Sequence, residues 1–207
     1  MKKGILGLLW ILIIFFSYKI YDSINGPIKF NEVKNKRYAD VINRLKTIRK
    51  AQIAHKDVKG VFSNNFDSLI KFIDEGIFTL IEKRDSSYLE YDRVYRIDML
   101  REVIVVDTLG TVSVKDSLFK QNEEYKKMAF IPVEGVEDSI FEIKSMIIDK
   151  NGYKVPVFEV KVSKNIVLFD QNKDLLKQEN ETISVDGVNG PEIILGSLSN
   201  VSTNGNW

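Results

Sequence analysis

Oxygen-bearing side chains near the C-terminal end of the chain have the spacing of a calcium-binding loop. They occupy its first, third, fifth and twelfth positions: Asp170, Asn172, Asp174 and Glu181. The sixth position, where such a loop needs glycine for its sharp turn, is Leu175. Two interpretations stay open, a calcium site on these four residues and a surface loop or short helix without metal, and we favour the second.

His55 is the only histidine, and the chain has no cysteine. A histidine-based catalytic dyad would have to centre on His55, while disulfides, thiolate metal sites and cysteine nucleophiles are excluded. No G-x-S-x-G motif, P-loop or dinucleotide-binding fingerprint occurs. We expect His55 to be a solvent-exposed helix residue, and we expect no enzymatic activity and no cofactor other than the calcium alternative.

The elements that would position these residues follow an apolar N-terminal segment, residues 4–18, which carries no charge. Its ten Leu, Ile and Phe residues contribute roughly −3 to −6 kcal/mol to insertion into a bilayer. Extended to residue 21, the helix would be about 27 Å long, close to the roughly 30 Å hydrocarbon core. We predict a transmembrane helix over 1–21. Its predicted membrane-contacting residues are Ile5, Leu6, Leu9, Leu12, Phe15, Phe16 and Lys19.

The orientation of this anchor follows from Lys2 and Lys3, which precede the apolar segment. A short basic head of this kind stays in the cytoplasm under the positive-inside rule. A cleaved secretory signal is the alternative, but residues 17–22 contain no pair of small residues of the A-x-A type. We expect an uncleaved single-pass anchor in the inner membrane, with the bilayer as a partner and the rest of the chain in the periplasm.

Charge is distributed unevenly, although the formal net charge is only +1. Residues 29–59 carry ten Lys and Arg against three acidic residues, whereas residues 60–207 carry 17 basic against 25 acidic residues. The basic segment could attract anionic lipid headgroups or an acidic neighbour, or could be the solvated face of a helix. No nucleic-acid-binding motif accompanies it, so we expect no nucleic-acid partner.

The Gly26-Pro27 pair favours a kink or break after the anchor, so we predict a hinge or linker at 22–30. Beyond it, apolar residues recur at spacings of three and four. This pattern predicts an amphipathic helix of roughly 25 residues that ends near Gly60. The side chains that would pack this helix against a sheet are Tyr38, Ile42, Leu45 and Ile48.

After a short helix that Gly76 would end, the hydrophobic period changes to two, as in β-strands. Asn151 and Gly152 predict a type I′ hairpin turn, because both residues accept positive φ. Residues 140–149 should therefore pair antiparallel with residues 153–162. Further strands are expected at 102–107, 111–114, 128–133, 166–169 and 192–195, with a short helix or loop at 170–178.

These elements predict an α+β fold in which the amphipathic helix packs on an antiparallel β-meander. With 207 residues, the chain has enough material for one ordinary domain beyond the anchor. The predicted organisation is a transmembrane helix at 1–21, a hinge at 22–30, an extracytoplasmic head at 31–196 and a polar C-terminal tail at 197–207.

A short basic head precedes the apolar helix, the helix from Tyr38 to Gln52 follows, and a Gly60-Val-Phe turn and Phe66-Asp-Ser-Leu lead to the sheet. This layout resembles that of type IV pilins and type II pseudopilins. In that family a peptidase cuts after a glycine, and a glutamate lies five residues into the mature chain. Here a cut after Gly4 would put Leu9 at the glutamate position.

The resemblance implies a non-enzymatic, membrane-anchored structural or assembly subunit of a bacterial envelope machine for secretion, motility or surface assembly. Its partners would be other membrane or envelope proteins, with self-association left open. The alternative function is a membrane-tethered extracytoplasmic module that binds a ligand or calcium.

Overall fold

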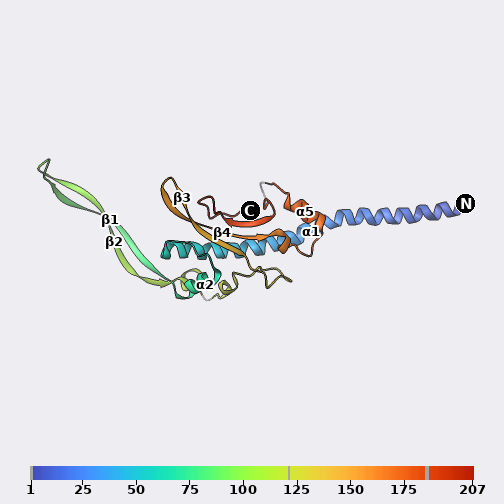
Figure 1. Cartoon of the computed structure of the whole chain (residues 1–207), viewed down its shortest axis with the longest axis horizontal. Coiled ribbons are helices and arrows are strands. Elements are labelled where there is room, and N and C mark those ends of the chain that lie inside the picture. The colour runs from blue at the N-terminus through green and yellow to red at the C-terminus, as the bar shows by residue number, and fades with distance from the viewer. Residues whose placement is uncertain (1, 121, 185–186) are drawn as a thin grey trace.

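The computed structural model describes residues 2–120, 122–184 and 187–207, apart from the side chains of residues 2–6 and 8. It has an α+β fold with three parts: a long helix, a head built around the C-terminal half of that helix, and a two-stranded β-ribbon (Figure 1). The free half of the helix and the ribbon leave the head at opposite ends, so the molecule is elongated.

Helix α1 (Lys2–Lys59) runs without interruption through Gly26 and Pro27. The predicted hinge at 22–30 is therefore wrong. A proline inside a helix removes one backbone hydrogen bond and costs about 3 kcal/mol, which does not end a helix that tertiary packing holds. That packing starts at Phe30, which is already buried in the head. The predicted end of the helix is confirmed, because Gly60 adopts a φ of 79° directly after Lys59.

The C-terminal half of α1 is the centre of the head and is covered on two sides (Figure 1). One layer is an antiparallel meander in the order β3 (Glu142–Lys150), β4 (Tyr153–Ser163) and β5 (Glu192–Gly196). The other contains α2 (Phe66–Glu75) and α3 (Val114–Leu118). The common core includes Val41, Leu45, Ile48, Leu69, Ile73, Phe158, Val160 and Ile193.

The residues predicted to pack α1 lie in or beside this core. Tyr38, Leu45 and Ile48 are buried, and Ile42 is half-buried against the same cluster. They recur along one side of the helix at the three- and four-residue spacing that a helix presents to a neighbouring layer.

The hairpin between β3 and β4 turns at Asn151 and Gly152, whose φ angles are 56° and 81°. Both angles are positive, as the predicted type I′ turn requires. The predicted last strand is also confirmed, since β5 pairs antiparallel with β4. Residues 197–207 turn back onto this sheet, where Gly205 bridges to Leu195. The polar C-terminal segment is therefore packed on the head.

The ribbon consists of β1 (Ile77–Asp92) and β2 (Ile97–Ser113), which pair antiparallel along their whole lengths. The separate strands predicted at 102–107 and 111–114 are one strand, β2, which continues past Leu109 with a bulge. The bulge accommodates Leu109, the extra residue in β2, at the position where the sequence indicated a turn.

Two other predicted strands are wrong. Residues 128–133 follow a 3₁₀ turn, η1 (Glu124–Lys127), and contribute only an isolated bridge from Phe130 to Ile140. Residues 166–169 overlap α4 (Lys164–Val167) instead of a strand. Most of their apolar side chains fill the core, from a short helix and from irregular segments, and sequence periodicity does not distinguish these from a short buried strand. The expected short helix after residue 170 is α5 (Lys173–Asn180).

Candidate interaction surfaces

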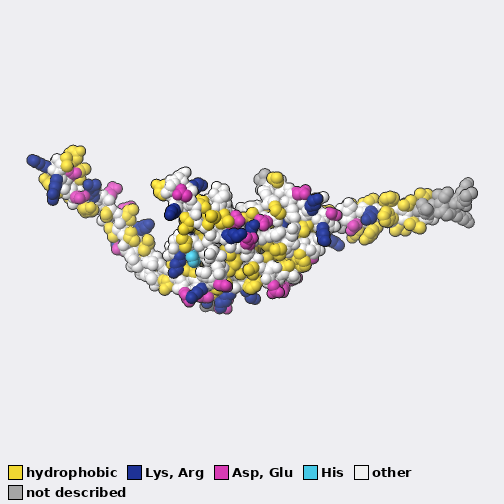
Figure 2. Space-filling view, in the orientation of Figure 1, with side chains coloured by type: hydrophobic (Ala, Val, Ile, Leu, Met, Phe, Trp, Pro, Cys, Tyr) yellow, Lys and Arg dark blue, Asp and Glu magenta, His cyan; other side chains and the backbone are white. Residues whose placement is uncertain are grey.

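The N-terminal half of α1 extends away from the head, and apolar side chains are exposed along the face of it that Figure 2 shows. Ile11 and Ile14 are 70% and 67% exposed. Of the predicted membrane-contacting residues, Leu9, Leu12, Phe15, Phe16 and Lys19 are exposed here. The side chains of the other two, Ile5 and Leu6, lie outside the described residues. Over the residues that were described, no helix combines the length and the apolar character needed to cross a membrane.

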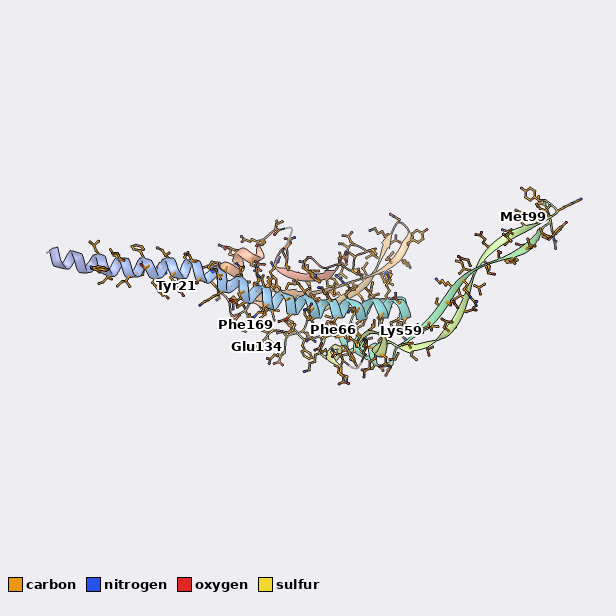
Figure 3. All side chains as sticks on the ribbon, turned by 180° about the vertical axis from the view of Figure 1, so that it is seen from behind. Tyr21, Lys59, Phe66, Met99, Glu134 and Phe169 are labelled. Atoms are coloured by element: carbon orange, nitrogen blue, oxygen red, sulfur yellow. The ribbon has the colours of Figure 1, made fainter. Side chains whose placement is uncertain are left out.

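The second exposed apolar surface is the β1–β2 ribbon. Met99 lies near its tip, well separated from Lys59 and Phe66 in the head (Figure 3). At about 3.4 Å per residue, the 16 residues of β1 span about 54 Å. Large apolar side chains are exposed along both strands, among them Tyr88, Leu89, Tyr91, Ile97, Leu100, Ile104, Val105 and Val106.

The two strands of the ribbon differ in the middle. β1 has four consecutive charged residues there, residues 82–85, whereas β2 has the uncharged, β-branched residues 103–106. The register places Lys83 opposite Val106 and Asp85 opposite Ile104. In the middle of the ribbon, therefore, one edge strand is charged and the other is apolar.

At the base of the free helix, Arg37 fastens α1 to the loop before α5. Its two terminal nitrogens donate to the carboxylate oxygens of Asp170 at 2.6 and 2.9 Å, and Nη1 also donates to the carbonyl oxygen of Val167 at 3.0 Å. The hydrogen bond from Arg37, with one from Gln171, lowers the pKa of Asp170 from 3.8 to about 2.

A buried charge network lies next to this pair. Lys164 is fully buried, and its Nζ donates to Glu179 Oε1 at 3.1 Å and to the carbonyl oxygens of Glu179 and Val188 at 2.8 Å each. Lys34 Nζ reaches the other carboxylate oxygen of Glu179 at 3.0 Å, and the Tyr38 hydroxyl donates to Oε1 at 3.3 Å. The network joins α1, α4 and α5.

Burial and hydrogen bonding together determine the pKa values in this network. Burial lowers the pKa of the Lys164 ammonium, against the opposing effect of Glu179. For Glu179, burial acts to raise the pKa, but the hydrogen bonds from Lys34 and Lys164 outweigh it and lower the pKa. Burial, together with the Glu179 carboxylate, raises the pKa of Tyr38 well above its usual value. The carboxylate is therefore held charged between two ammonium groups, as a structural ion cluster.

Two of the four residues of the predicted calcium loop have side chains that are engaged elsewhere. Asp170 pairs with Arg37, and Asn172 Oδ1 caps α5 by accepting from the backbone N–H groups of Asp174 and Leu175 at 2.8 and 3.3 Å. Glu181 ends the same helix. Within the described residues, no three His, Asp or Glu side chains form a group that could hold a metal ion. Calcium binding by these residues stays an untested alternative.

The prediction that His55 is solvent-exposed is wrong. The side chain is 9% exposed, its Nδ1 lies 2.6 Å from the carbonyl oxygen of Val61, and its ring meets that of Phe72 edge-on with centroids 4.9 Å apart. Gln52, one turn earlier, exchanges hydrogen bonds with the backbone of Ser63 at 2.8 and 2.9 Å. Both residues hold the chain reversal after α1, where the sequence shows only a polar helix end.

No protein-family model matches this chain, and neither does any curated protein or solved structure. The function must follow from the surfaces themselves. Sequence patterns predicted the exposed helix and parts of β2, at 102–107 and 111–114, but not β1 or its pairing with β2.

Proposed function

We propose that the chain is a non-enzymatic, membrane-anchored assembly subunit of a bacterial envelope machine, with a pilin- or pseudopilin-like layout. The observation that carries the proposal is the contrast along α1. Its first half exposes nearly every apolar side chain that the structure describes, whereas from Phe30 onward most of its apolar side chains are buried or half-buried in the head.

The bilayer is the proposed environment of the first half. Transfer of its ten Leu, Ile and Phe residues from water into hydrocarbon contributes roughly −3 to −6 kcal/mol to the free energy of insertion. Lys19 would extend its ammonium to the headgroup region. The basic residues at 2 and 3 favour a cytoplasmic N-terminus, which places the head in the periplasm.

The continuity of α1 supports a role in placement. A single helix of 58 residues is about 87 Å long and couples the membrane segment rigidly to the head. The Arg37–Asp170 pair and the Lys34–Glu179 pair fasten the helix to α5 and its preceding loop just where it enters the head. Buried ionisable groups in this region have structural partners, which supports a non-enzymatic role.

Three experiments on the full chain test the proposal. Alkaline carbonate extraction of bacterial membranes should leave the chain in the pellet, and protease added to spheroplasts should digest the head. Photo-crosslinking in intact cells should then recover either ladders of the chain or other envelope proteins. A chain found in the soluble fraction, or one without crosslinked neighbours, would contradict the proposal.

A further inference from the structure

The ribbon is too thin to account for its own stability. A two-stranded hairpin is at best marginally stable in water, and independent stability requires a third strand or a covering layer. Among the described residues, β1 and β2 form a sheet of their own, and the ribbon meets the head only at its base (Figure 1). Ile104 in the middle of β2 is 64% exposed. The ribbon therefore needs a further strand or a covering layer from another molecule.

The charges of the ribbon determine which edge can accept that strand. Unpaired edge strands are normally protected from association by charged residues, and lysine is a frequent example. The middle of β1 has this protection from Lys83, Arg84 and their acidic neighbours. The facing segment of β2, residues 103–106, has none. Strand addition is therefore favoured on β2.

We propose that the outer edge of β2 pairs antiparallel with the β2 edge of a second copy of this chain, in register about Ile104. In that register Ile104 meets its own copy and Val103 meets Val105. Arg101 meets Asp107 on both sides of the two-fold axis, and Glu102 meets Val106. Within its own ribbon, Arg101 is ion-paired with Glu90 and Asp107 with Arg84, so opposite charges flank an apolar centre at residues 103–105. A two-fold axis requires such self-complementarity, and the sequence around Ile104 provides it.

The paired ribbons form a four-stranded antiparallel sheet. Leu89, Leu100, Ile104 and Val106 lie on the same face, because residues opposite each other in the register share a face and side chains alternate along each strand. The two copies thus combine their exposed apolar residues on one continuous sheet. The biological role of this pairing rests on the proposed assembly function, whereas the pairing itself requires only the ribbon.

The cysteine-free sequence allows a direct test in the full chain, solubilised in detergent. Ile104→Cys should form a disulfide-linked dimer on mild oxidation, because directly opposed residues have Cβ atoms about 4.5–5.5 Å apart. Asp85→Cys is the matched control. Asp85 is the cross-strand neighbour of Ile104, at the same height on the other edge, and should give no dimer. Equal linkage from both positions, or linkage from neither, would overturn the proposal.

The register is tested with a mixture of two variants. A Val103→Cys chain should link to a Val105→Cys chain in preference to its own copy. Adding Ile104→Lys to both should abolish this link, because two ammonium groups then meet on the axis, while Asp85 across the ribbon keeps the strand pair folded. Linkage that survives Ile104→Lys, or that joins the ribbon to a different protein in cell membranes, would refute self-pairing. Membrane fractionation of these variants separately tests the anchor.

Discussion

Lys164 Nζ lies 3.1 Å from Glu179 Oε1, at a position where the lysine side chain has no exposed surface. The pair joins the residue that begins α4 to the last turn of α5, 15 residues further along the chain. Lys34 of α1 binds the same carboxylate at 3.0 Å. One glutamate therefore links α1, α4 and α5.

Glu179→Gln should lower the free energy of unfolding by about 3 kcal/mol or more, because it leaves the Lys164 ammonium buried without a counter-charge. Urea denaturation of the detergent-solubilised chain measures this loss. Glu181→Gln, an exposed neighbour, is the control and should change stability little. The double variant Lys164→Met with Glu179→Leu should recover part of the loss. A Glu179→Gln chain as stable as the parent would contradict a structural role for the pair.

The Arg37–Asp170 pair should make stability depend on acid pH. The pKa of Asp170 is about 2 in the folded chain, below its ordinary 3.8, so the folded state binds this proton less readily. The stabilisation is then fully present above about pH 4 and is lost as pH falls toward 2. Because the Asp170 side chain is 41% exposed, we expect the pair to contribute about 1 kcal/mol at most to the free energy of unfolding.

Asp170→Asn should remove this acid-sensitive component. Urea unfolding at several pH values between 2 and 5 gives the comparison, with Asp138→Asn at another exposed position as the control. Parallel pH profiles for the parent and Asp170→Asn chains would show that the pair adds no stability.

Calcium should leave the thermal midpoint of the chain unchanged. Asp170 is paired with Arg37, and the Asn172 side-chain oxygen is engaged in capping α5, so a bound ion would have to displace both. A ligand that binds only the folded state raises the midpoint with its concentration. Thermal unfolding at increasing calcium concentration measures this, with magnesium as the comparison. A rise specific to calcium that Asp174→Asn removes would establish the loop as a metal site.

Local signals in the sequence were sufficient for much of the head. Gly76 ends α2, and Asn151 with Gly152 forms the hairpin turn, as the sequence predicted. Each depends on a backbone preference that a few residues determine. The apolar stripe of α1 was visible for the same reason, since its spacing repeats over several turns.

The remaining features depend on partners far away in the chain. Arg37 and Asp170 are 133 residues apart, and no local pattern distinguishes Lys164 from an exposed lysine. The four charged residues in the middle of β1 interrupt the apolar pattern expected of a strand, so the sequence did not predict it. Pairing with β2 stabilises this strand. Pro27 does not end the helix, because packing from Phe30 onward stabilises it.

The exposed half of α1 gives the most direct test of membrane anchoring. Leu12→Arg with Phe16→Arg should move the chain from the membrane pellet to the soluble fraction. Each arginine near the centre of a span costs about 2.5–3.5 kcal/mol, so two offset the roughly −3 to −6 kcal/mol that favours insertion. Both side chains are exposed and make no part of the core, so the head should keep its urea midpoint. Ile24→Arg, on the same helix but beyond the span, is the control and should stay in the pellet. An unchanged distribution of the double variant would mean that something other than the apolar helix holds the chain at the membrane, because no other term in the insertion energy compensates for two buried guanidinium groups.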